Sequence, residues 1–78
     1  MSESVPQKPR IAVIGLGSMG FGMATSLRRA GFNVTGCDVS DDAVARFVAD
    51  GGNGARTPAQ AAGGADIVVS VEIGRAHV

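Results

Sequence analysis

The sequence predicts an α/β fold in which strands and helices alternate around a parallel sheet. Apolar runs typical of buried strands lie at residues 11–14, 32–37 and 67–71, and residues 53–56 can hold a further short strand. Segments with helical periodicity or helix-capping residues separate these runs. Strict alternation of this kind predicts right-handed crossovers, with the strands ordered 3-2-1-4 across the sheet.

The first strand runs directly into a glycine-rich turn. Residues 11–20 read IAVIGLGSMG, so the pattern Gly15-x-Gly17-x-x-Gly20 follows an apolar run and precedes a helix. Gly15 allows a tight turn, Gly17 lets backbone approach a pyrophosphate, and Gly20 permits close helix packing. In isolation the pattern is also compatible with an ordinary glycine-rich turn, but its strand–turn–helix setting predicts a Rossmann-type dinucleotide site. The cofactor-binding residues predicted in this turn are Gly15, Leu16, Gly17, Ser18, Met19 and Gly20.

The first helix is predicted over residues 18–30. Met23, Leu27 and Ala30 recur at helical spacing and predict its buried stripe. Gly31 is suited to end the helix in a left-handed conformation. A second strand at residues 32–37 then follows within one or two residues.

The second helix is predicted to begin after Ser40, a good N-cap residue. Val44, Phe47 and Val48 supply its predicted buried face, and Gly51 with its neighbouring glycine ends it. A shorter helix follows the third strand. Its predicted start is a capping box in Thr57-Pro58-Ala59-Gln60, and Gly63-Gly64 stops it before the fourth strand.

Asp38 completes the predicted dinucleotide site. It lies 18 residues after Gly20, directly behind the second apolar run, where an acidic residue can bind ribose hydroxyls. Its carboxylate would repel the 2′-phosphate of NADP, and residues 39–42 contain no arginine. The sequence therefore favours NAD over NADP as the cofactor. The alternative is that Asp38 is a solvated loop carboxylate.

Composition excludes several other classes of function. Seven basic and seven acidic residues cancel, so charge gives no reason to expect binding to nucleic acid or to an anionic membrane. No apolar run approaches the ~20 residues of a membrane span. The single cysteine, Cys37, cannot form an internal disulfide and is interpreted as a small buried residue in a cytoplasmic protein.

The stretch GLGSMGFGMATSLRRAGFNVTGCDVS, with the later ADIVVSV, resembles the N-terminus of the β-hydroxyacid dehydrogenases. That family includes 3-hydroxyisobutyrate and L-threonate dehydrogenases and is related to 6-phosphogluconate dehydrogenase. The resemblance covers residues 10–71 and implies an NAD(P)-dependent oxidoreductase acting on a small hydroxy acid, homo-oligomeric at full length. It also implies that the glycine turn binds the phosphates and Asp38 the ribose.

The same resemblance places the family's catalytic lysine, its supporting asparagine and its substrate loop well beyond this chain. The one lysine, Lys8, lies in the N-terminal segment at residues 1–9, which we expect to be a flexible arm. No catalytic residue or metal ligand is therefore predicted, and the chain alone is expected to be inactive. A non-catalytic NAD(H)-binding module and a non-functional truncated product remain the alternatives.

Residues 72–78, EIGRAHV, depart from the family pattern. Apart from the first base, a possible coding sequence for them resembles the start of a common sequencing-library adapter. We therefore expect a non-native tail at residues 72–78 and give His77 no functional role.

Overall fold

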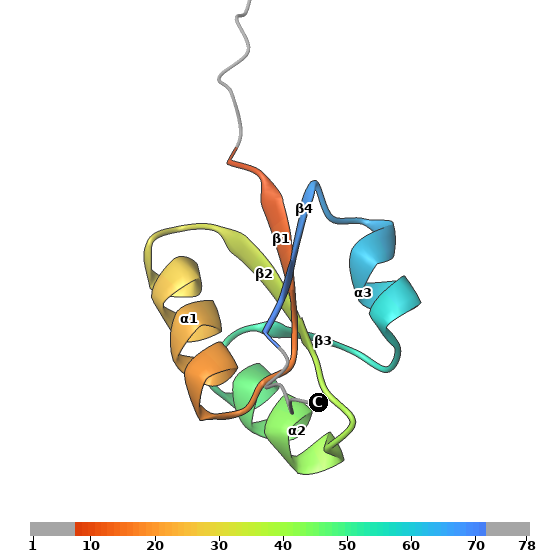
Figure 1. Ribbon diagram of the computed structural model, residues 1–78. Coiled ribbons are helices and arrows are strands. Elements are labelled where there is room, and N and C mark those ends of the chain that lie inside the picture. The colour runs from red at the N-terminus through yellow and green to blue at the C-terminus, as the bar shows by residue number, and fades with distance from the viewer. Residues whose placement is uncertain (1–7, 72–78) are drawn as a thin grey trace, which may run out of the picture.

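A computed structural model describes residues 8–71, in which four strands and three helices alternate. The elements are β1 (Arg10–Ile14), α1 (Ser18–Arg29), β2 (Asn33–Cys37), α2 (Asp41–Ala49), β3 (Asn53–Ala55), α3 (Pro58–Gly63) and β4 (Ile67–Ser70). The strands form one parallel sheet in the order β3-β2-β1-β4 (Figure 1). The predicted fold class and strand order are confirmed.

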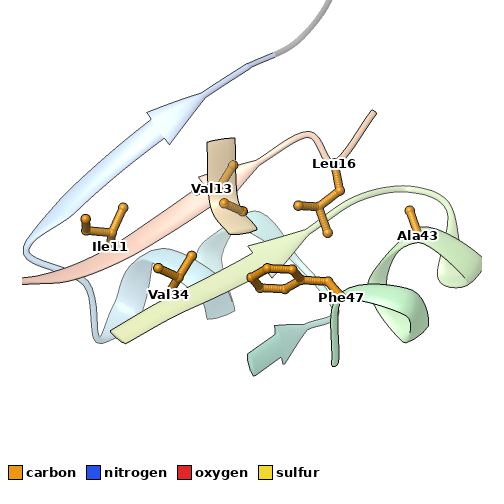
Figure 2. Close-up of a cluster of buried hydrophobic side chains, with 7 residues drawn as sticks. Ile11, Val13, Leu16, Val34, Ala43 and Phe47 are labelled. Atoms are coloured by element: carbon orange, nitrogen blue, oxygen red, sulfur yellow. The ribbon is translucent and has the colours of Figure 1, made fainter. Parts of the chain in front are cut away.

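Alternate residues of the central strands face two different helical layers. Helices α1 and α2 lie on one face of the sheet and α3 lies on the other (Figure 1). On the first face Val13 and Val34 pack with Phe47 of α2, whose ring points toward the sheet (Figure 2). The opposite face is lined by small residues such as Ala12, which packs with Ala61 of α3. One face therefore holds the larger side chains of the core, and α3 covers a thinner layer.

The buried face of α1 differs from the prediction. Met23 is 37% exposed and Ala30 is the exposed C-cap residue, whereas Gly20 and Ala24 are buried. Leu27 keeps its predicted place against the core. The helical spacing is thus correct, but the stripe is rotated, because the turn before α1 brings Gly20 into contact with backbone and so sets the rotation of the helix. Small residues then let α1 approach the sheet closely.

The start of α2 is as predicted, and its buried face is partly so. The Ser40 hydroxyl oxygen accepts a hydrogen bond from the N–H of Ala43 at 3.3 Å, confirming the N-cap. Phe47 is fully buried and Val44 is partly buried, as expected. Val48, however, is 47% exposed, and Ala43 is buried in its place. A nine-residue helix presents only a narrow face, and the bulky Phe47 ring determines which face that is.

Both longer helices end at a glycine with positive φ. Gly31 has φ +101° and Gly51 has φ +108°, a region that L side chains rarely adopt. In each case the next N–H donates to a helix carbonyl five residues earlier, at 3.1 Å and 3.0 Å. These bonds form Schellman motifs, so the predicted helix stops are confirmed with their mechanism.

The cap of α3 follows a variant of the predicted capping box. The Thr57 hydroxyl oxygen accepts from the N–H of Gln60 at 3.0 Å, as expected. The Gln60 side chain, however, accepts from the N–H of Arg56 at 2.7 Å, one residue before the cap. That contact takes up the Arg56 N–H, and β3 ends one residue earlier than predicted, at Ala55.

Strand β4 is an edge of the sheet within the described residues. It pairs with β1, and Ile67 and Val68 are 45% and 49% exposed. The predicted apolar edge is therefore confirmed for the part of the chain that the structure describes. The expectations for residues 1–7 and 72–78 concern positions outside that part.

Candidate functional site

The glycine turn leaves the carboxyl end of β1 and leads into α1. Gly15 has φ +100°, and its N–H donates to the carbonyl of Cys37 on β2 at 2.8 Å. The positive φ confirms that this position favours glycine, and the hydrogen bond ties the turn to the neighbouring strand.

Gly20 and Gly17 meet different surroundings. A Cβ on Gly20 would collide with the carbonyl of Gly15, so close packing of the helix on the turn requires glycine here. A Cβ on Gly17 would have no neighbour within 4 Å and would project into open space. Glycine is therefore required at position 20 for packing, whereas the space beside Gly17 is free for another molecule.

The start of α1 has several free backbone donors. Gly17 is the N-cap residue, with no side-chain capping bond, and the first backbone bond across the turn joins the N–H of Phe21 to the Gly17 carbonyl at 2.7 Å. The N–H groups of Ser18, Met19 and Gly20 therefore have no helix carbonyl to bind. Oriented N–H groups at the positive end of a helix dipole attract anions.

The Asp38 carboxylate accepts a hydrogen bond from this turn, a contact that the sequence did not indicate. The N–H of Leu16 donates to its Oδ2 at 2.6 Å, and the N–H of Ser40 donates to its Oδ1 at 2.8 Å. The carboxylate therefore joins the glycine turn to the loop between β2 and α2. These contacts give Asp38 a structural role in the loop, and its binding of ribose stays a prediction. A carboxylate has about four acceptor positions, so each oxygen can still accept a further hydrogen bond.

A cavity of about 490 Å³ opens between the glycine turn, the start of α1 and helix α2. Its lining includes Gly17, Ser18, Phe21, Asp38, Ser40 and Arg46. A second cavity, of about 550 Å³, lies beyond Asp38 toward β3 and includes Asp41, Val44 and Arg56. Asp38 thus separates two open spaces at the carboxyl ends of the strands, the usual location of ligands in parallel α/β sheets.

Leu16 and Met19 are the predicted site residues with large apolar side chains. The Leu16 side chain is buried in the core, so only its backbone faces the site. The Met19 side chain is 67% exposed and does not line the first cavity. These two residues contribute backbone to the turn rather than side-chain chemistry.

Arg46 was not predicted, because a basic residue near the site was expected only at residues 39–42, directly after Asp38. It follows Ala43 at i+3 on α2, so the two lie on one face of the helix, and that face borders the cavity containing Asp38. Helical spacing from the Ser40 cap could have located it.

Cys37 lies beside this site but is shielded from it. Its side chain is buried at the end of β2. Burial raises the pKa of the Cys37 thiol, and the neighbouring Asp38 carboxylate raises it further. The thiol therefore stays protonated at neutral pH, in agreement with its interpretation as a packing residue.

The described part of the chain, residues 8–71, contains no group of three or more His, Cys, Asp or Glu side chains that could hold a metal ion. It also has no helix of the length and hydrophobicity needed to cross a membrane.

Residues 10–76 match the family model of the NAD binding domain of 6-phosphogluconate dehydrogenase. The chain belongs to this family. It is 46% identical over 63 residues to the L-threonate dehydrogenase of Cupriavidus necator, which covers 81% of this chain and 21% of that protein. The sequence-based resemblance to β-hydroxyacid dehydrogenases is confirmed.

Solved structures of several oxidoreductases share the fold. A 3-hydroxyisobutyrate dehydrogenase from Salmonella typhimurium aligns with a TM-score of 0.73 and 37% identity, over 78% of this chain and 22% of that one. An imine reductase variant from Myxococcus stipitatus, solved with NAD⁺, gives a TM-score of 0.79 and 26% identity, over 82% and 22%. The chain thus spans about a fifth of the length of the relatives it matches.

Proposed function

We propose that this protein is the coenzyme-binding part of an oxidoreductase that transfers hydride between a nicotinamide dinucleotide and a small hydroxy acid. The observation that carries the proposal is the juxtaposition of free helix N–H groups with the Asp38 carboxylate across one open cavity. Family membership and the dehydrogenases among its relatives support the reaction class.

The glycine turn would hold the pyrophosphate. The N–H groups of Ser18, Met19 and Gly20 supply donors, and the open space beside Gly17 lets the ligand approach the backbone. Gly15 and Leu16 contribute by shaping the turn, since one has positive φ and the other is anchored to Asp38. The residues present therefore fit a dinucleotide.

Asp38 would hold the adenosine ribose. Its two oxygens keep acceptor positions beyond the two backbone bonds, and those positions suit the 2′- and 3′-hydroxyls of NAD. We propose NAD as the preferred cofactor on this ground. When bound, the nicotinamide ring accepts or donates the hydride, and this chain's part is to bind and orient the dinucleotide.

The first experiment measures NAD binding by titration calorimetry. It uses the 78-residue chain and, in parallel, a graft protein, in which residues 10–71 replace the matching segment of the C. necator L-threonate dehydrogenase. Gly17→Val fills the space above the turn and is expected to weaken NAD binding roughly tenfold or more, which corresponds to about 1.4 kcal/mol.

Gly22→Val is the matched control. Gly22 also has nothing within 4 Å of an added Cβ, but it lies within α1 and does not line the cavity. Equal loss in both variants would contradict a site at the turn. A graft protein that binds NAD but does not oxidise L-threonate, while the unaltered relative does, would contradict the hydride-transfer part and favour a non-catalytic binding module.

A further inference from the structure

A third cavity, of about 430 Å³, lies at the amino ends of the strands, on the face of the sheet that α3 covers. This end of the sheet is opposite the glycine turn, which follows the carboxyl end of β1 (Figure 1). Arg10 of β1 pairs in register with Asn33 of β2, and Thr35 lies two residues further along β2 on the same face. All three line the cavity, which shares no lining residue with the cavity beside Gly17.

The lining is polar for the inward face of a parallel sheet. Strands covered on both faces are normally apolar, yet Arg10, Asn33 and Thr35 occupy positions on the face toward α3. Further along the same face Ala12 and Cys37 are apolar and buried in the layer beneath α3. Helix α3 has six residues and covers only that part. The polar side chains therefore line a part of the sheet that the helix leaves open.

Hydrogen bonds in this lining occupy the acceptors of two amide side chains. The Asn33 Oδ1 accepts from the Asn53 side chain at 2.9 Å, and the Gln60 Oε1 accepts from the N–H of Arg56 at 2.7 Å. Among residues 8–71 no recorded hydrogen bond uses the NH₂ group of Asn33 or of Gln60. Each amide therefore keeps its donors available at the cavity.

Arg10 adds a positive charge to these donors. Its guanidinium donates to the Gly64 carbonyl at 3.3 Å, which offsets the repulsion of an anion by that carbonyl and leaves further N–H groups. The half-buried Thr35 hydroxyl can donate as well. Asp66 accepts from the backbone N–H of Arg10 at 2.9 Å but does not line the cavity, and no other acid does. The lining side chains therefore carry a net positive charge.

We propose that this cavity is a second ligand site, which binds a phosphate group. Arg10 supplies the charge, and its planar fork can bind two phosphate oxygens. Asn33, Thr35 and Gln60 supply neutral donors for the remaining oxygens. A carboxylate has only two oxygens and would leave part of this donor set unused. The site does not overlap the proposed dinucleotide site, so the inference does not rest on the proposed function.

The test is an NMR titration of the ¹⁵N-labelled graft protein, and of the 78-residue chain where it is folded. The ligands are inorganic phosphate and glycerol 3-phosphate, which separate free phosphate from a phosphate ester as the ligand. The side-chain N–H signals of Arg10, Asn33 and Gln60 report on the proposed contacts and are expected to shift saturably with at least one of the two. Acetate at equal ionic strength should bind about tenfold more weakly or less.

Two substitutions in the lining separate the charge from the neutral donors. Arg10→Met is expected to weaken phosphate binding about tenfold or more, because it removes charge-assisted hydrogen bonds, and the amide signals of Asn33 and Gln60 still report the binding. Thr35→Val keeps the shape of the side chain without its hydroxyl and should weaken binding about fivefold.

Arg29→Met is the matched control, since it removes the same charge from the end of α1 and does not line the cavity. It should leave phosphate binding within about twofold of wild type, and so should Gly17→Val at the opposite end of the strands. The absence of saturable shifts in a folded graft protein would overturn the proposal. Equal affinity in wild type and Arg10→Met, acetate binding as tight as phosphate, or loss of the shifts in Gly17→Val would also overturn it. Failure to bind NAD with the phosphate shifts intact would contradict the proposed function alone.

Discussion

Asp38 is expected to stabilise the glycine turn even in the absence of a ligand. Its carboxylate is the sole side-chain acceptor recorded for the Leu16 N–H among the described residues, and it also accepts from Ser40. Asp38→Ala removes both bonds. Asp38→Asn keeps one acceptor oxygen but places an NH₂ donor opposite the second N–H, so one bond is lost together with the charge.

The magnitude follows from the burial of the two contacts. A hydrogen bond to a charged acceptor contributes about 1.5–3 kcal/mol, and the short bond to Leu16 is partly buried. The bond to Ser40 is exposed and is expected to contribute about 0.5–1 kcal/mol. Asp38→Ala should therefore lower the free energy of unfolding of this segment by about 2–4 kcal/mol, and Asp38→Asn by about half of that.

Hydrogen exchange measured by mass spectrometry on the ligand-free graft protein reads out this effect locally. The exchange rate of the Leu16 amide should rise by roughly a factor of 10 for each 1.4 kcal/mol of local stability lost. Exchange should be fastest in Asp38→Ala, slower in Asp38→Asn and slowest in wild type. Asp42→Ala removes a nearby carboxylate that makes no recorded contact with the turn and serves as the control. Unchanged Leu16 exchange in Asp38→Ala would refute the reasoning that this contact holds the turn.

Two further predictions concern packing and the sheet edge. Gly20→Ala should lower the free energy of unfolding by about 1–3 kcal/mol, because the added Cβ collides with the Gly15 carbonyl. Gly22→Ala should raise it by about 0.5–1 kcal/mol, because alanine is favoured over glycine within a helix and the added Cβ meets no neighbour. Urea unfolding of both variants measures the difference. The 78-residue chain expressed alone should be poorly soluble or molten, since Ile67 and Val68 expose an apolar strand edge. A sharp, cooperative melt of a soluble monomer would contradict this expectation. Val68→Lys should improve the solubility of the chain, because a charge on the strand edge opposes edge-to-edge pairing.

Local signals in the sequence were sufficient for most of the fold. Strand runs, the caps at Ser40 and Thr57 and the stops at Gly31 and Gly51 depend on contacts within a few residues, so they could be predicted before any tertiary structure. The side of each helix that is buried was less predictable. Met23 and Val48 have the right hydrophobicity and spacing but face solvent, because the rotation of a helix is set by what it packs against.

The candidate site, like the fold, could be predicted only in part from the sequence. The sequence by itself determined the alternating fold, the glycine turn and an acidic residue at the end of the second strand, because each is encoded in spacing along the chain. Tertiary structure alone decided that the Asp38 carboxylate binds the Leu16 N–H and that Arg46 shares its cavity. These residues are separated along the chain and meet only because parallel pairing of β1 with β2 brings their carboxyl ends together, with α1 and α2 on the same face.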